Sequence, residues 1–348
     1  MPRSACRPRS VRPRDRRRAG RARGAAPHER PPSSLSRSHA GASRNCPACP
    51  PRYRASRSAD PRAYGCYGRA MRLAVVGHIE WIRFARVRHV PSPGGIEHAT
   101  ETWQGAGGGG AVAAVQLAKL GGTCLFLSAL GDDHVAGDVR ADLLSDHVEL
   151  HAAERRGPTR TAFTMIDDTG ERTIITIGER LEPHGEDGLP WDQLGGADGV
   201  FFTAGDVRAL RAARRARVVV ATSRVLGVLA DGGLQLDAIV GSADDPAERY
   251  EAGLVSPEPR LVVRTEGPSG GSWEAADGAR GRYAAATPPG PIADMYGAGD
   301  SFQAGLTFGL ASGLDIDAAL ALAARCGAFA VTGRGPTGGQ LTASGLRA

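Results

Sequence analysis

The chain has 348 residues, 41% of them hydrophobic, which is enough for one large α/β domain or for two smaller domains. No apolar run approaches the about 18 residues of a membrane-spanning helix, which excludes an integral membrane protein. The net charge of +6 is unevenly distributed, because residues 1–70 hold 18 arginines and three acids, a net charge of +15. The remainder, at −9, has the charge of an ordinary acidic soluble domain.

Residues 1–70 contain ten prolines and no apolar periodicity, a composition that predicts a disordered tail. Their arginines are compatible with a nucleic-acid-binding arm or an organelle transit peptide, but the Arg-Pro-Arg repeats would break the amphipathic helix of a transit peptide. Met71 is the first methionine after Met1 and directly precedes an apolar run. We therefore favour a start of translation at Met71 over a functional arm, and expect no nucleic-acid partner.

Cysteine use shows the same division, with four cysteines in the tail and two, Cys124 and Cys326, in the rest of the chain. Two cysteines in a body of this size form no disulfide framework, which predicts a reducing compartment and a cytoplasmic location. Cys46 and Cys49 have the spacing of half a zinc site, but no second pair follows at zinc-finger spacing. The histidines also lack metal-ligand spacing, and we interpret His78 as a surface or core residue.

Short apolar runs recur after Met71, and helix-compatible stretches such as residues 111–120 and 206–215 separate several of them. This alternation predicts βαβ units and a mainly parallel sheet. The predicted strands are residues 73–76, 124–127, 200–203, 218–221, 238–240 and 261–263.

Two stretches, near residues 80–103 and 159–178, have a different character. The second alternates apolar and polar residues on both sides of the turn at residues 167–170, which predicts a hairpin with one covered face. A hairpin inserted into a parallel α/β unit would form a lid over a site. Further along, apolar residues at four-residue spacing up to Gly313, and an Ala-rich run over 315–331, predict two helices that cover one face of the sheet.

The segment from Asp294 to Phe302 carries the most informative chemistry. The small residues at 297–299 would let backbone N–H groups approach an anion, and a helix opening at Asp300 would add the positive end of its dipole. The Asp300 carboxylate would then lie beside a transferring phosphoryl group and could accept a proton from the attacking hydroxyl. Taken alone, this short pattern favours an Asp300 that only caps the helix.

The run Gly297-Ala298-Gly299-Asp300, together with Asp294, resembles the signature of the PfkB, or ribokinase-like, family of carbohydrate kinases. Other segments agree with the family in order and spacing: Gly107-Gly108 with the helix after it, residues 130–137, and residues 265–271. The resemblance spans almost all of residues 71–348. It implies one kinase domain there, with a three-layer α/β/α sandwich, a mainly parallel central sheet and a small β-lid.

The resemblance also implies the activity: transfer of the γ-phosphoryl group of ATP to a hydroxyl of a sugar or sugar-like molecule, with Mg²⁺ bridging the phosphates. Asp300 would be the base, and the backbone amides of Gly297, Ala298 and Gly299 would form an anion hole. The lid would exclude water, and a homodimer through the lid is compatible with this picture. Three further groups of residues complete the expected site: Thr265, Gly267, Gly270 and Asp294 for ATP; Gly107, Gly108 and Glu80 for the acceptor; and Asp245, through water, for the metal.

Several positions depart from the family pattern. The family usually has an acid that holds sugar hydroxyls, and this chain lacks it, although Glu80 could substitute for it. The loss of hydroxyl-binding side chains puts an ordinary free sugar in doubt. These departures also permit a second function, a catalytically weak or inactive relative that senses a nucleotide or metabolite. The retained Asp300 favours catalysis, and the acceptor is not identified. The departures are Ile82 in place of the acid, Val112 in place of Asn, Ser242 in place of the Asn of an Asn-x-x-Glu segment, and Met295 in place of Thr.

Overall fold

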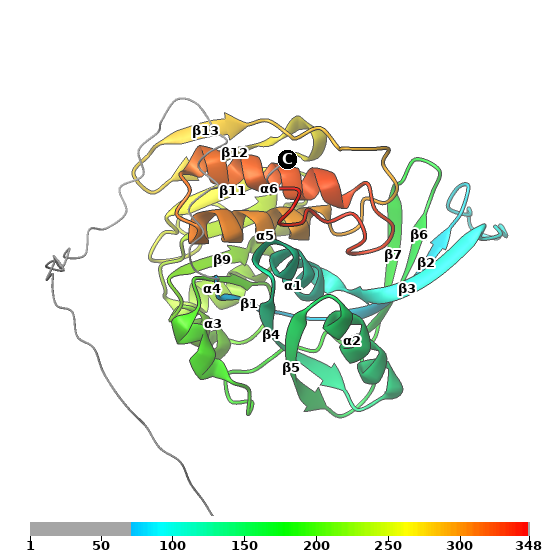
Figure 1. The fold of residues 1–348 in the computed structure, drawn as a ribbon, viewed down its shortest axis with the longest axis horizontal. Coiled ribbons are helices and arrows are strands. Elements are labelled where there is room, and N and C mark those ends of the chain that lie inside the picture. The colour runs from blue at the N-terminus through cyan, green and yellow to red at the C-terminus, as the bar shows by residue number, and fades with distance from the viewer. Residues whose placement is uncertain (1–70, 347–348) are drawn as a thin grey trace, which may run out of the picture. The chain divides into compact units, whose positions relative to one another are not determined.

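The computed structural model describes residues 71–346, and all structural statements refer to these residues. The predictions for the Arg-rich tail and its cysteines lie outside them. A nine-stranded sheet forms the centre of the described part (Figure 1). Its strands are β1 (Leu73–Val76), β4 (Cys124–Gly131), β5 (Val148–Arg155), β8 (Gly199–Phe202), β9 (Val218–Thr222), β10 (Ala238–Ser242), β11 (Leu261–Thr265), β12 (Gly271–Ala275) and β13 (Arg280–Tyr283).

The strands lie in the order β13-β12-β11-β10-β9-β8-β1-β4-β5. Those from β11 to β5 are parallel, whereas β12, near one edge, pairs antiparallel with both β11 and β13. Every residue of β1, β8 and β9 is buried, as expected for strands of a parallel sheet with both faces covered. The predicted strands and the mainly parallel sheet are confirmed.

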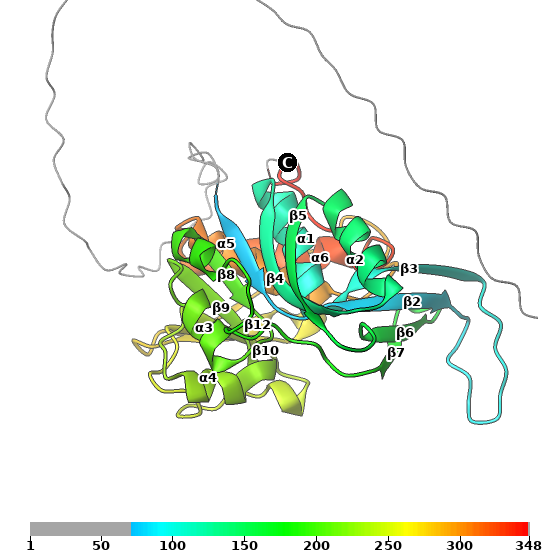
Figure 2. The same cartoon turned by 90° about the horizontal axis from the view of Figure 1, so that it is seen from below.

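Helices cover both faces, which confirms the three-layer architecture. On one face, Leu117 of α1 and Leu306 of α5 pack in one core with Phe201 of the sheet. On the other, Leu210 of α3 packs with Val219. Figure 2 shows α3 and α4 on the opposite side of the sheet from α5 and α6. Within residues 71–346, no helix is long and apolar enough to cross a membrane. The helices are α1 (Gly108–Gly121), α2 (His134–Ser145), α3 (Val207–Ala213), α4 (Leu226–Gly232), α5 (Ala298–Ala311) and α6 (Ile316–Ala330).

A second sheet forms the predicted lid, at the right of Figure 1. It contains β2 (Glu80–Arg86), β3 (Glu101–Gly107), β6 (Thr161–Ile166) and β7 (Arg172–Ile177), in the order β3-β2-β6-β7. The hairpin of β6 and β7 is confirmed, with Ile166 opposite Arg172. Its turn touches the signature segment, because the amide of Met295 donates to the carbonyl of Gly170 (3.4 Å). The lid is therefore closed onto the body of the protein.

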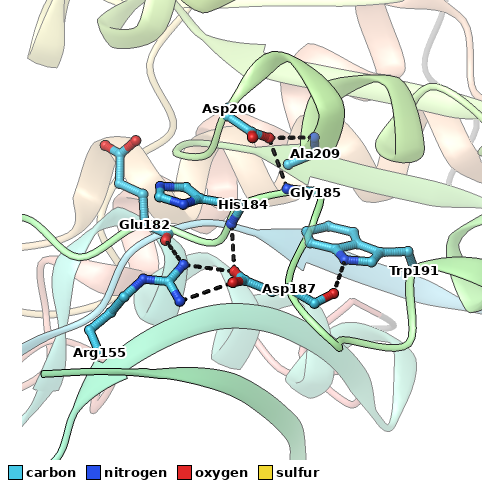
Figure 3. Close-up of polar contacts among 8 residues, drawn as sticks. All are labelled: Arg155, Glu182, His184, Gly185, Asp187, Trp191, Asp206 and Ala209. Atoms are coloured by element: carbon cyan, nitrogen blue, oxygen red, sulfur yellow. Dashed lines mark hydrogen bonds and ion pairs between the residues drawn. The ribbon is translucent and has the colours of Figure 1, made fainter.

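The segment that leads from the lid back to the sheet is anchored by polar contacts (Figure 3). Arg155, at the end of β5, donates two hydrogen bonds to Asp187 (2.9 and 2.7 Å) and one to the carbonyl of Glu182 (2.9 Å). Asp206, the N-cap of α3, accepts a hydrogen bond from the amide of Gly185 (2.9 Å). These contacts hold the segment against β5 and α3 and so fix this end of the lid.

Candidate active site

The carboxyl ends of the parallel strands lie along one edge of the central sheet, where open α/β sheets bind their ligands. The amino end of α5 is at the same edge, because Gly199, at the start of β8, lies against the other end of α5. A Cβ built on Gly199 would be 2.8 Å from the Cβ of Ala311. The side chains at this edge include His78 after β1, Thr203 after β8, Arg224 after β9, Asp245 after β10 and Thr265 at the end of β11.

The helix of the signature segment begins at Ala298, not at Asp300 as the sequence predicted. Gly297 is its N-cap, with a left-handed backbone (φ +76°) that favours glycine. A Cβ there would also lie 2.9 Å from Val112 Cγ1. Asp300 is the third helical residue, so the interpretation of Asp300 as the N-cap is wrong. The amides of Ala298 and Gly299 belong to the first turn, whose N–H groups have no partner within a helix.

The Asp300 carboxyl faces the glycine run at the start of α1. A Cβ built on Gly109 would be 2.9 Å from Asp300 Oδ1 and 3.0 Å from Thr203 Oγ1. Burial raises the pKa of Asp300 to about 6, and the positive charge of Arg224 is the largest charge that opposes this rise. A carboxyl with such a pKa is suited to take up and release a proton near neutral pH.

Gly107 and Gly108 directly precede Gly109, and the surrounding side chains explain why both are glycine. A Cβ on Gly107 would be 2.3 Å from Ile82 Cδ1. Gly108 has a left-handed backbone (φ +81°), and its amide donates to Tyr296 Oη (3.0 Å). The start of α1 is therefore packed against both the lid and the signature segment.

Two departures from the family pattern pack against each other. Ile82 and Val112 are fully buried in one apolar cluster with Phe84 and Tyr296. Apolar side chains thus fill the space near Gly107 where the resemblance would place hydroxyl-binding groups. Glu80, two residues before Ile82 in β2, is buried and pairs with Arg160 Nε (3.0 Å). Burial raises the pKa of Glu80.

His78 is a site residue that the sequence interpretation missed. It is buried, and its Nδ1 accepts a hydrogen bond from Arg180 Nη2 (2.8 Å), which also donates to the carbonyl of Thr203 (3.0 Å). Burial, and then the charge of Arg180, lower the pKa of His78 well below its usual value, so the ring is neutral at pH 7. The only signal in the sequence was its position after Gly77 at the end of a predicted strand.

The predicted nucleotide turn follows β11 at the same edge. Gly267 (φ +54°) and Gly270 (φ +84°) both have backbones that favour glycine. A Cβ on Gly270 would lie 2.1 Å from the carbonyl oxygen of Tyr283, whereas the space around Gly267 is open. Asp294 is fully buried, and its two oxygens accept hydrogen bonds from the amides of Tyr296 (2.8 Å) and Gly335 (3.1 Å). In this structure Asp294 shapes the signature loop.

Carboxylates suited to Mg²⁺ follow β10. Asp245 Oδ2 lies 3.1 Å from Arg224 Nη2, and Glu248 binds the same guanidinium while its Oε2 accepts from the amide of Ser242 (2.9 Å). Within residues 71–346, no group of three or more potential ligands could hold a metal alone. Mg²⁺ is usually bound by one or two carboxylates together with substrate phosphates, and Asp245 and Glu248 fit that mode.

Comparison with solved structures identifies the fold. The ribokinase of Thermotoga maritima matches with a TM-score of 0.65 and 18% identity, over 79% of this chain and 98% of that one. The adenosine kinase of Sinorhizobium meliloti matches with a TM-score of 0.66 and 19% identity, over 80% and 99%. Arabidopsis thaliana ribokinase, complexed with ribose and ATP, matches with a TM-score of 0.63 and 19% identity, over 80% and 98%. The fold is that of ribokinase.

Sequence comparison extends this result from fold to family. The ATP-dependent ribose-1-phosphate kinase of Halopiger xanaduensis is 28% identical over 276 residues, which are 74% of this chain and 91% of that protein. The acarbose 7(IV)-phosphotransferase of an Actinoplanes species is 42% identical over 78 residues, 21% of this chain and 25% of that protein. The family model of the pfkB family carbohydrate kinases matches residues 70–218 and 235–343. The chain therefore belongs to the PfkB family of carbohydrate kinases.

Proposed function

We propose that this chain transfers the γ-phosphoryl group of ATP to a hydroxyl of a sugar or sugar-like small molecule. The observation that carries the proposal is the position of Asp300, a carboxyl in the first turn of α5 that faces the glycine run of α1. First-turn amides attract a negative charge, and a carboxylate beside them can accept the proton of an attacking hydroxyl.

In the proposed reaction the hydroxyl proton of the acceptor passes to Asp300 as the hydroxyl oxygen bonds to the γ-phosphorus. The bond from that phosphorus to the β–γ bridging oxygen breaks, and its electron pair leaves with ADP. The amides of Gly297, Ala298 and Gly299 stabilise the charge on the transferring group. The closed lid excludes water, which disfavours hydrolysis of ATP.

The remaining groups bind and orient the reactants. We propose that Thr265, Gly267, Gly270 and the loop held by Asp294 bind ATP, and that Gly107, Gly108 and Glu80 bind the acceptor. Mg²⁺ would neutralise charge on the phosphates, with Asp245 contacting it through water and Glu248 nearby.

A screen of ATP consumption tests this function. Ribose and ribose 1-phosphate are the first acceptors to try, because relatives are named for ribose and ribose 1-phosphate. Other sugars, sugar acids, nucleosides and polyols follow. Acceptor-dependent formation of ADP by the wild-type chain supports the proposal. Tight binding of ATP without turnover of any acceptor would overturn it in favour of a sensor.

We also propose a homodimer formed through the lid. All six residues of β7, the edge strand of the lid, are exposed. Three of them are isoleucines, Ile174, Ile175 and Ile177. An exposed edge strand with apolar side chains readily pairs with another chain.

We further propose a reducing, cytoplasmic location. The unpaired thiols of Cys124 and Cys326 support it.

A further inference from the structure

Arg224 occupies the middle of the sheet edge on which the proposed kinase reaction depends. It lies in the single turn η3 (Ser223–Val225) directly after β9. Thr222 Oγ1 accepts a hydrogen bond from the amide of Arg224 (3.4 Å), which caps this turn. In the sheet, β9 lies between β10 and β8. Arg224, at the end of β9, is therefore located between the proposed nucleotide turn after β11 and the proposed acceptor side beyond β8.

Two carboxylates hold one end of the Arg224 side chain. Asp245 and Glu248, from the turn after β10, both pair with Nη2. The shortest contact to each carboxylate is made by this nitrogen, and the hydrogen bond to Asp245 also comes from it. The side chain is 55% exposed even in these pairs. Arg224 is thus oriented by acids and still open to the site.

The guanidinium is also close enough to act on the catalytic groups. Among the charged groups, Arg224 has the largest effect on the pKa of Asp300, which it lowers. It is also one of the arginines that lower the pKa of His78. The other charges that act on Asp300 are those of Glu248, Arg172 and Glu80. Arg224 is the cation among these that extends from the central sheet, because Arg172 belongs to the lid.

We propose that Arg224 is a catalytic residue that donates hydrogen bonds to the γ-phosphoryl group of ATP during transfer. This inference rests on the proposed kinase function. A planar guanidinium can donate two N–H groups at once to phosphate oxygens, whose negative charge must be stabilised while the bond to ADP breaks and the bond to the acceptor oxygen forms. The Asp300 base would face the attacking hydroxyl, and Arg224 would hold the group under attack.

The departure from the family pattern at Ser242 supports a phosphate-binding role for Arg224. The family usually has Asn there, in the segment that organises magnesium, whereas the Ser242 amide is bound by Glu248, a partner of Arg224. Arg224 brings a fixed positive charge to the same place. The charge of Arg224 would therefore compensate for the missing Asn in the segment that organises magnesium.

Binding measurements that need no acceptor can test the proposal. Calorimetric titration of the full chain would use adenylyl imidodiphosphate, which has a γ-phosphoryl group, and ADP, which has none, both with Mg²⁺. For Arg224→Gln we expect affinity for the imidodiphosphate to fall about 10- to 100-fold, the usual contribution of a charged hydrogen bond, with ADP affinity changed less than about threefold. Arg224→Lys keeps the charge and should lose less.

Arg215→Gln is the matched control. Arg215 precedes β9 at the opposite end of the strand, pairs with Asp192 and is 52% exposed, so this variant should bind both nucleotides normally. Melting temperatures of all variants check folding, and Arg224→Lys serves if the Gln variant does not fold. Equal losses for both nucleotides, or no loss for either, would overturn the role of Arg224. A wild-type chain that binds neither nucleotide would overturn the proposed kinase function as well.

Discussion

At the scale of single residues, the proposed catalysis depends on how the protein surrounds one carboxyl. Asp300 is placed in the first turn of a helix, where the dipole favours negative charge, yet burial raises its pKa to about 6. Neighbouring His78 is neutral and cannot supply a compensating positive charge. The site thus keeps a base that is charged at pH 7 but less stable than a solvated carboxylate.

Replacing this base should separate catalysis from binding. Asp300→Asn keeps the size and polarity of the side chain but cannot accept the hydroxyl proton, so turnover should fall about 10²- to 10⁴-fold. Affinity for ATP should remain near wild type. Initial rates and nucleotide titrations on the same variant measure both quantities once an acceptor is known. Asp317→Asn, in the first turn of α6, is the control and should retain full turnover. Near-normal turnover of Asp300→Asn would end the assignment of the base.

The same carboxyl should set the acid limb of the pH profile. Its folded-state pKa of about 6 lies above the usual 3.8, and only the deprotonated form is a base. The value of kcat/KM should therefore rise with pH through about 6 and level off above it. A midpoint near 4 would contradict this environment for Asp300.

Stability gives an independent check of this pKa. Because the folded state binds this proton more tightly, the contribution of Asp300 to the free energy of unfolding declines as pH rises from about 3.8 to about 6. At pH 8, Asp300→Asn should be more stable than wild type by roughly 1 to 3 kcal/mol, the lower end reflecting the partial exposure of the side chain. The difference should shrink toward pH 4, as thermal melts at several pH values would reveal.

At the scale of elements, the nucleotide turn and the start of α1 depend on glycine for different reasons. Gly270 is enclosed by the β12–β13 hairpin, since a Cβ would collide with the carbonyl of Tyr283. Gly267 has open space around it and needs glycine only for its backbone conformation. Open space at a sheet edge leaves room for a ligand to approach the backbone.

The two glycines should therefore respond differently to substitution. Gly267→Val should weaken nucleotide binding while the fold is largely retained, apart from a backbone cost of about 1–2 kcal/mol. Gly270→Ala should lower the melting temperature more, because β13 must move. Nucleotide titration, circular dichroism and thermal melts on both variants test this contrast. Unchanged affinity in Gly267→Val would mean that the nucleotide binds elsewhere.

At the scale of the whole molecule, the lid is the part whose apolar surface is least covered. The inner cluster of the lid, which includes Ile82 and Phe84, is buried against the body, whereas β7 exposes its isoleucines at the sheet edge. A second copy of the chain could add a strand to β7 and cover them.

The proposed dimer should depend on this strand. Ile175→Glu places a charge on the exposed edge and should shift the protein toward monomer, while leaving the melting temperature of the chain nearly unchanged, because Ile175 lies outside the core. Sedimentation of wild type and variant over a range of concentrations measures the change. Leu144→Glu, an exposed apolar position in α2, is the control. A wild-type chain that sediments as a monomer would contradict the lid dimer.

The sequence by itself determined the layered α/β architecture of residues 71–346, although β5, β12 and β13 were not among the predicted strands. Its six apolar runs, its alternating hairpin within 159–178 and its helical periodicity after Asp300 are local patterns, and all three correspond to elements of the structure. Local patterns suffice for this because burial on one face or on both leaves a periodic signature in consecutive residues. The motif order also pointed to the family that the comparisons established.

The tertiary structure decided how the site is assembled. It placed the helix start at Ala298, brought His78 to Asp300, paired Arg224 with Asp245 and Glu248, and packed Ile82 against Val112. None of these relations follows from periodicity, because they join residues from separate strands and helices. They arise where parallel strands end side by side, and a side chain there takes its neighbours, its charge environment and its pKa from the packing of the whole sheet.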